Sequence, residues 1–284
     1  MKLWFADSAL FENAYLFGAR RSLVSYAYIA PGNVGDRWIK GHPRDAEIFL
    51  DSGAFGVMTG RVIISLPEYC YYIRANAGAL VAYAALDVIG DVGASWENYE
   101  KMCRLGLDPV QTWHIGEPLE DLDRITAAAA VGQKLMAIGG MAGRATNQTL
   151  GGLQRVLDGA WARIGKHWPV RVHAFGVTAG EVMLRYPFYS ADSISHALAA
   201  GMGKVMTFDG GEISTRHWVD YARRFMTMGV AGSDWRSNRD ERWRVNIGVL
   251  LEMERFITDT WAARGISWPE VSQSAAVVKG FECE

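Results

Sequence analysis

The chain has 284 residues, of which 50% are hydrophobic and 21% are charged, and its formal net charge at pH 7 is −2. So apolar a chain can bury enough surface to offset the conformational entropy lost on folding, which excludes intrinsic disorder, and the lack of any run of about 18 apolar residues excludes a membrane span. The balanced charge excludes binding to nucleic acid by overall attraction, so such binding has to use a local patch.

Short apolar segments alternate with helical patterns along the chain. The expected strands are 22–29, 47–50, 80–86, 109–115, 134–138, 171–175, 187–191 and 203–208. The expected helices are 66–76, 95–105, 118–131, 147–165, 179–185, 193–201 and 215–228. This alternation is typical of parallel strands joined by crossover helices, and eight strand positions favour a TIM (β/α)8 barrel over an open sheet. We therefore expect an α/β fold with a single domain spanning 1–284.

Polar residues and glycines stand at the ends of most expected strands. They are Asp51, Asp87, His114, Gly139, Gly140, Gly176 and Asp192. In a parallel barrel the carboxyl ends of all strands meet at one rim, where enzymes of this fold carry their chemistry. A single aspartate after a strand can equally be a helix cap or a turn residue, and a single histidine can be structural. Three carboxylates at separate strand ends, together with the glycines, predict an active site.

Five segments resemble, in order, the motifs of a known family. They are FLDSGAFGVMTG (49–60), ALDVIGD (85–91), PVQTWHIGEPLEDL (109–122), MAIGGMAG (136–143), and HAFGVT (173–178) followed by YSADS (189–193). Together they resemble the guanine transglycosylases, the queuine and archaeosine tRNA-ribosyltransferase-like family, which exchange guanine in nucleic acid for a 7-deazaguanine base. The motifs lie within 45–215, and we expect 216–284 to hold C-terminal barrel helices and a segment rich in arginine and tryptophan.

The resemblance implies a role for each carboxylate. Asp192 is the nucleophile that holds a covalent glycosyl intermediate, and Asp51 is the general acid and base for the leaving and entering bases. Carboxyl groups suit both roles, because one can attack an anomeric carbon while another transfers a proton. Asp87 accepts hydrogen bonds from the donor edge of the guanine, which suits a group that only accepts.

The resemblance also implies a set of residues around the base. Gly139 and Gly140 offer backbone N–H groups where a side chain would block the base. His114 replaces or neighbours the base-contacting glutamine of the family, and Gln111 is the other candidate for that position. The remaining residues expected to shape this pocket are Ser52, Phe55 and Gly176, although Phe55 can equally belong to the core.

The chain departs from the tRNA-directed enzymes of the family in its cysteines. Those enzymes carry a Cys-x-Cys-x-x-Cys and His zinc site after the nucleophile strand, whereas here only Cys283 follows Asp192. Cys70 and Cys103 are too distant to complete a metal cage or a disulfide framework, so we expect no zinc, no other metal and no cofactor. A cytoplasmic setting, in the host cytoplasm if the chain is phage-encoded, and no membrane segment follow as expectations.

The missing zinc subdomain helps the tRNA enzymes to hold their substrate, so the resemblance favours the DNA-directed branch found in phages and bacteria. In phages that modification protects DNA against restriction. The expected partners are therefore DNA, with its target guanine flipped out or single-stranded, and a free 7-deazaguanine base. The alternative is a tRNA-guanine transglycosylase. The oligomeric state is open, with a homodimer as the arrangement common in the family.

A stretch rich in arginine supplies the candidate nucleic-acid surface. Tryptophans are interleaved with arginines between 223 and 244, a combination that suits phosphate contact and base stacking. The same pattern is also typical of a solvent-exposed helix face with internal ion pairs. The predicted contacts are Arg236, Arg239, Arg242 and Arg244. Two further alternatives stay open: a barrel enzyme for a small phosphorylated or carboxylated substrate, and a non-catalytic barrel that only binds nucleic acid.

Overall fold

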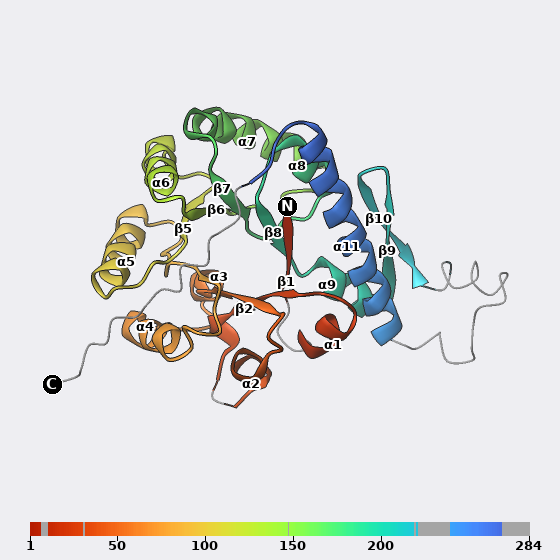
Figure 1. Cartoon of the computed structure of the whole chain (residues 1–284), viewed down its shortest axis with the longest axis horizontal. Helices are drawn as coiled ribbons and strands as arrows, with labels where there is room; N and C mark the ends of the chain where they lie inside the picture. Colours follow the sequence, from red (N-terminus) through yellow and green to blue (C-terminus); the bar gives the residue numbers. More distant parts are fainter. Residues whose placement is uncertain (7–10, 31, 147, 219, 221–238, 269–284) are drawn as a thin grey trace.

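The computed structural model describes residues 1–6, 11–30, 32–146, 148–218, 220 and 239–268. At its centre lie eight strands surrounded by helices (Figure 1). The strands are β1 (Lys2–Ala6), β2 (Arg21–Ser25), β3 (Glu47–Asp51), β4 (Ala82–Tyr83), β5 (Gln111–His114), β6 (Leu135–Gly139), β7 (Arg171–Ala174) and β8 (Ser190–Ser193).

The eight strands form a parallel barrel. Their order is β4-β3-β2-β1-β8-β7-β6-β5, and every hydrogen-bonded pair within this order is parallel. The two outer members, β4 and β5, are joined by a parallel bridge between Ala84 and Val110, where the Val110 N–H donates to the Tyr83 carbonyl at 2.8 Å. The α/β barrel expected from the sequence is confirmed.

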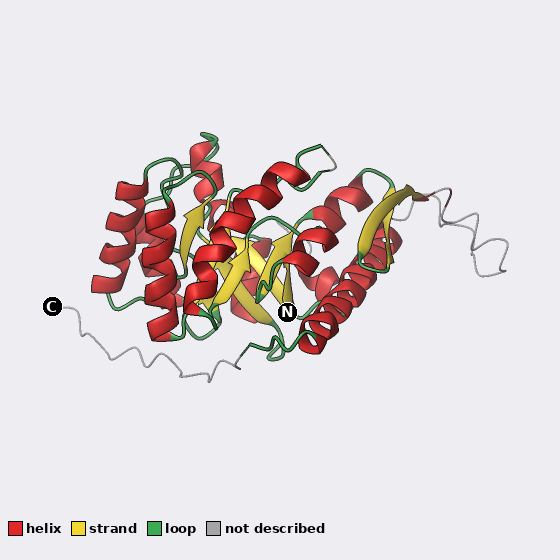
Figure 2. Ribbon diagram, turned by 90° about the horizontal axis from the view of Figure 1, so that it is seen from above, coloured by secondary structure: helices red, strands yellow, loops and turns green. Residues whose placement is uncertain are grey.

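Helices follow the strands and cover the outside of the barrel (Figures 1 and 2). They are α1 (Phe11–Leu16), α2 (Val34–Gly41), α3 (Ala54–Met58), α4 (Leu66–Ala75), α5 (Val92–Arg104), α6 (Leu119–Gly132), α7 (Leu150–Ile164), α8 (Gly180–Arg185), α9 (Ser195–Gly201) and α11 (Arg239–Ala263), with 3-10 turns at Tyr26–Tyr28 and Gly165–His167. Side-chain caps explain two of the starts, since Asn33 accepts from the Asp36 N–H and Asp91 from the Ala94 N–H. Among the described residues, no helix is both long and apolar enough to cross a membrane.

The expected eighth barrel strand, 203–208, was misplaced. This segment is β9 (Lys204–Asp209), which pairs antiparallel with β10 (Glu212–His217) outside the barrel (Figure 2). Gly210 and Gly211 form the two-residue turn with φ of 57° and 106°, a conformation that glycine adopts easily and that favours a tight hairpin. The eighth position belongs to β1, which precedes the first strand expected.

The helix expected at 215–228 was placed too early at its start. Its first residues, up to His217, belong to β10, Trp218 and Asp220 are helical, and 219 and 221–228 lie outside the described residues. The other expected helices are present, with ends shifted by a few residues.

The strand register sorts side chains between the barrel interior and the helix layer. An apolar cluster, made of Trp4, Leu23, Phe49, Ala84, Val110 and Ala137, fills the interior. Because side chains alternate along a strand, Asp51 two residues after Phe49 and Gly139 two after Ala137 point to the same interior. His114 lies opposite Gly139, and Asp192 lies opposite Trp4. The polar residues therefore stand above an apolar floor, at the carboxyl ends of the strands.

The C-terminal half of helix α11 contacts the amino end of β1, the end opposite to the polar residues. The Glu254 carboxylate accepts from the Leu3 N–H at 3.1 Å and also pairs with Arg21 at the start of β2, while the Thr258 hydroxyl accepts from the Met1 amino group. The helix thereby holds the amino ends of two strands, β1 and β2, in place.

Candidate active site

Asp192 lies in the third position of β8, within the strand rather than directly after it as expected. Its Oδ1 accepts from the Gly176 N–H at 2.9 Å and from His173 Nε2 at 3.2 Å. Gly176 can offer this N–H because its φ of 74° turns the chain sharply after β7. Both donors hold Oδ1, so the carboxylate is oriented, and Oδ2 takes no hydrogen bond from the residues that the structure describes.

The orientation of Asp192 depends on a buried histidine. Because a carboxylate only accepts, Nε2 of His173 carries the proton, and Nδ1 then accepts from the Ser190 hydroxyl at 2.8 Å. His173 is fully buried and packs on the Phe49 and Phe175 rings. Neither His173 nor Ser190 was predicted from the sequence. The signal was present, since Ser190 stands two residues before Asp192 on the same face of the strand.

Asp51 is the last residue of β3, and its Oδ2 accepts from the Gly53 N–H at 3.1 Å. Burial, together with the charges of Asp192 and Asp87, raises the pKa of this carboxyl to about 6, although hydrogen bonds from Ser25 and Gly53 oppose the rise. Asp51 therefore shares an electrostatic environment with the other two carboxylates. The structure brings together the three aspartates expected at separate strand ends.

Asp87 and His114 form a hydrogen-bonded pair, with Oδ2 and Nε2 3.2 Å apart. Burial lowers the pKa of His114, but the hydrogen bond and charge of Asp87 outweigh it, so that the pKa lies above its usual value. The backbone N–H of His114 donates to Glu117 Oε2 at 2.8 Å. His114 thus belongs to the site through Asp87, and Glu117 is a neighbour that was not predicted.

Gly139, the last residue of β6, and Gly140, which follows it, are glycines for different structural reasons. A Cβ on Gly139 would lie 2.5 Å from His114 Nδ1, so this glycine makes room for the imidazole ring. Gly140 adopts a φ of 79°, which a side chain disfavours.

The other residues predicted to surround the base differ in their burial. Ser52 is buried directly after Asp51, whereas Phe55 on α3 is 58% exposed and is therefore not a core residue. Gln111, the alternative to His114, points away from the interior and lines a pocket between α5 and α6.

None of the predicted nucleic-acid contacts that the structure describes forms a hydrogen bond or ion pair with the three aspartates. Arg236 lies outside the described residues, and Arg239 stacks over the Trp243 ring at 5.7 Å. Arg242 donates to the Ala200 carbonyl near the end of α9, and Arg244 pairs with Glu241 at 2.7 Å. The described arginines therefore have their partners on α11 and α9.

The described residues contain no group of three or more histidine, cysteine, aspartate or glutamate side chains arranged to hold a metal ion. What the site offers is proton transfer and nucleophilic attack by carboxyl groups. One carboxylate is oriented by two donors, one has a pKa near neutrality, and one is paired with a histidine.

No family model matches the chain, and no curated protein matches it. Among solved structures, the tryptophan synthase α subunit from Campylobacter jejuni is 8% identical with a TM-score of 0.42, over 69% of this chain and 87% of that one. The carboxyl transferase domain of Rhizobium etli pyruvate carboxylase is 12% identical with a TM-score of 0.45, over 95% of this chain and 50% of that one. At this level of similarity the fold assignment rests on the strand order.

Proposed function

We propose that the protein is a guanine transglycosylase that exchanges guanine in DNA for a free 7-deazaguanine base, a pentosyl transfer. The observation that carries the proposal is the set of three aspartates around one mouth, in which Asp192 is oriented and Asp51 has a raised pKa. Two carboxyl groups with different ionisation are what base exchange at an anomeric carbon requires. The five motif resemblances supply the identity of the substrate.

In the first step, Oδ2 of Asp192 attacks C1′ of the target nucleotide, and a C1′–O bond forms as the C1′–N9 bond breaks. The departing guanine takes the electron pair of that bond and a proton from the Asp51 carboxyl. A pKa of about 6 makes Asp51 a competent acid near neutral pH. His173 and Gly176 keep Asp192 pointed at the sugar throughout.

In the second step, the incoming base gives its N9 proton to the Asp51 carboxylate and attacks C1′, and the bond to Asp192 breaks. Protons and bonds balance over the cycle, so no external oxidant or energy source enters. Asp87, held by His114, presents its second carboxylate oxygen to the donor edge of the base. The same contact serves the leaving guanine and the entering base.

Nucleoside mass spectrometry tests the proposal. The protein is incubated with a 7-deazaguanine base and, in separate reactions, duplex DNA, single-stranded DNA or tRNA. We expect a modified deoxynucleoside with the wild type and none with Asp192→Asn, whose side chain keeps an oxygen for the His173 and Gly176 donors. A modified ribonucleoside alone would replace DNA by tRNA, and no product with any substrate would refute the proposal.

A further inference from the structure

The connection between β3 and α4, residues 52–65, carries an exposed apolar surface. Phe55, Val57 and Met58 of α3 are exposed, and Ile63, which follows α3, is 96% exposed. Because the connection begins directly after Asp51, it lies at the carboxyl ends of the strands, where the three aspartates are. Large apolar side chains that gather on the surface of a globular protein mark a place where a partner binds.

The backbone of this connection is held in place by close packing. A Cβ on Gly53 would lie 2.6 Å from the Cβ of Ala27, so the start of α3 packs directly on the 3-10 turn after β2. Gly56 is buried, a Cβ there would lie 3.0 Å from Val62, and its carbonyl accepts from the Arg61 N–H at 2.9 Å. The apolar side chains are therefore exposed on a well-packed backbone.

Two exposed arginines stand at the mouth. Arg61 lies in the β3–α4 connection, and Arg144 lies in the β6–α7 connection, residues 140–149. Neither connection contains an acidic residue. Within the ranges that the structure describes, neither guanidinium forms a hydrogen bond or an ion pair. A guanidinium suits a phosphate, because its planar fork of N–H donors matches two phosphate oxygens.

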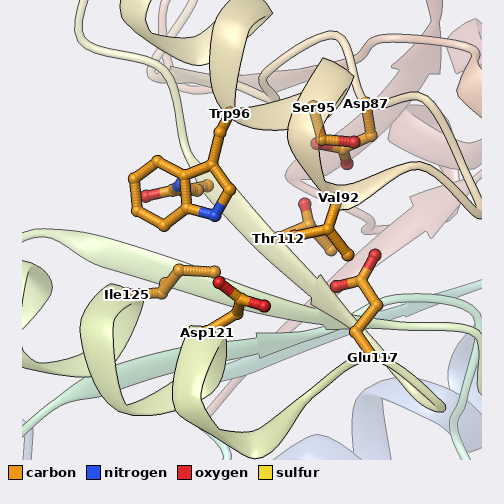
Figure 3. A pocket seen from close by; sticks show the side chains of 9 residues that line it. Asp87, Val92, Ser95, Trp96, Thr112, Glu117, Asp121 and Ile125 are labelled. Atoms are coloured by element: carbon orange, nitrogen blue, oxygen red, sulfur yellow. The ribbon is translucent and has the colours of Figure 1, made fainter.

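An acidic sector separates the two arginines. In the order of strands around the barrel, β4 and β5 lie between β3 and β6. Asp87 and Glu117 follow these two strands and line a small pocket together with Asp121 (Figure 3). Carboxylates repel phosphates, but they accept hydrogen bonds from the N–H groups of a base. This sector therefore suits a base, and the two arginines suit phosphates on either side of it.

We propose that a single strand of DNA crosses the mouth, with Arg61 and Arg144 on phosphates at the two sides of the target nucleotide and Phe55 stacked on a neighbouring base. The path rests on the proposed function, because it places the target guanine among the aspartates. A base that leaves its stack uncovers its neighbour, and an exposed aromatic ring covers that neighbour again. This surface takes the place of the α11 arginines predicted from the sequence.

The salt dependence of binding tests the two arginines. A labelled single-stranded oligonucleotide with one guanine is titrated with the full chain at several salt concentrations, and binding is followed by fluorescence anisotropy. Every protein in this assay carries Asp192→Asn, so that no covalent adduct forms. Each phosphate contact of a single strand contributes about 0.7 to the slope of log affinity against log salt. We expect Arg61→Gln and Arg144→Gln each to lower the slope by that amount, which is about a fivefold loss of affinity at about 0.1 M salt.

Arg104→Gln is the matched control. It makes the same charge change at an exposed residue, the last of α5, which lies at the opposite end of the barrel because the helices run antiparallel to the strands. We expect its affinity to stay within twofold of the parent and its slope to be unchanged. Equal losses in all three variants would reduce the effect to overall charge and contradict the proposal. Unchanged binding in both Arg61→Gln and Arg144→Gln would overturn it.

Stacking on Phe55 is tested with 2-aminopurine, whose fluorescence is quenched when it stacks. The oligonucleotide carries 2-aminopurine next to the guanine, and its emission is measured in the complex. We expect Phe55→Ala to raise the emission several-fold and to weaken binding at least fivefold. Tyr71→Ala, which removes an equally exposed aromatic ring from α4, should change neither. The same emission with Phe55→Ala and the parent would overturn the stacking.

Failure of this path and failure of the proposed function give different results. Exchange of labelled guanine by the wild type, with unchanged binding in the arginine variants, would overturn the path and leave the reaction standing. No exchange, with the expected losses of binding, would refute the reaction and leave the DNA surface standing. An RNA strand that binds more tightly than the same DNA sequence would overturn the assignment to DNA. A dimer that dissociates in Ile63→Ser without a change in DNA affinity would make this surface a protein interface and overturn the proposal.

Discussion

Asp51 links the chemistry of the site to the stability of the fold. Its pKa is raised to about 6, so in the folded protein the carboxyl is neutral below that pH and ionised above it. An acid with a raised pKa stabilises the fold below its ordinary pKa, and this contribution is lost as the pH rises through the folded value. The raised pKa therefore lowers the stability of the fold near neutral pH, and it leaves Asp51 able to act as the acid of the proposed reaction.

Replacing Asp51 by Asn removes that cost. We expect Asp51→Asn to raise the free energy of unfolding at pH 8 by about 2 kcal/mol, and the gain to vanish at pH 4, where the wild-type carboxyl is protonated. Urea denaturation at the two pH values measures the difference. A variant that is destabilised at pH 8, or equally stabilised at both pH values, would contradict the raised pKa.

In the proposed reaction, His173 acts through its hydrogen bond to Asp192. We expect His173→Phe, which keeps an aromatic ring among Phe49 and Phe175, to slow release of guanine from DNA in a single turnover by about 10- to 100-fold. The reason is the loss of one of two donors on Oδ1 of Asp192. Ser190→Ala, which only frees Nδ1 of His173, should slow the step less. Equal rates in His173→Phe and the wild type would exclude a positioning role.

At the scale of the elements, the pairing of β5 with β6 requires a glycine at position 139. Gly139 lies opposite His114, and any Cβ there would collide with the imidazole. We expect Gly139→Ala to displace the ring, break its bond to Asp87 and destabilise the protein by about 2 kcal/mol. Thermal unfolding and base affinity measure the two effects. Gly151→Ala on α7, where a Cβ meets nothing within 4 Å, is the control and should be neutral or stabilising.

The sequence predicted the barrel and its mouth because both follow from local patterns. Strands that end in Asp51, His114 and Gly139 combine an apolar run with a polar or glycine residue, and parallel packing brings such ends together. The donors on Asp192 were not predictable in the same way, because His173 and Gly176 reach it only through the register of β7 and β8.

The errors of the sequence analysis also have physical causes. The segment 203–208 has the apolar character of a barrel strand, but the adjacent Gly210 and Gly211 fold it back into a hairpin before a crossover can form. Strand β1 was not predicted, although its five residues have the same burial pattern as those of β2 and β3. The alternation of apolar segments with helical patterns predicts how many strands there are, but it does not predict which of them belong to the barrel.

For the molecule as a whole, the two ends of the barrel differ in what they carry. Carboxyl groups gather at the carboxyl ends of the strands, whereas α11 ties down the amino ends through Glu254 and Thr258. The described arginines of the expected nucleic-acid surface belong to α11, where Arg242 contacts the Ala200 carbonyl of α9 and Arg244 pairs with Glu241. With a net charge of −2 the chain has no overall attraction for DNA, so the proposed substrate must be held mainly by the site and its rim.

The account depends most on Asp192 as the nucleophile, and trapping the covalent intermediate tests this directly. The protein is mixed with a guanine-containing oligonucleotide without an incoming base, quenched in denaturant, and examined by intact-mass and peptide mass spectrometry. We predict a protein–DNA adduct whose bond maps to Asp192, and no adduct with Asp192→Asn. An adduct on another residue, or exchange of guanine that continues in Asp192→Asn, would contradict the account.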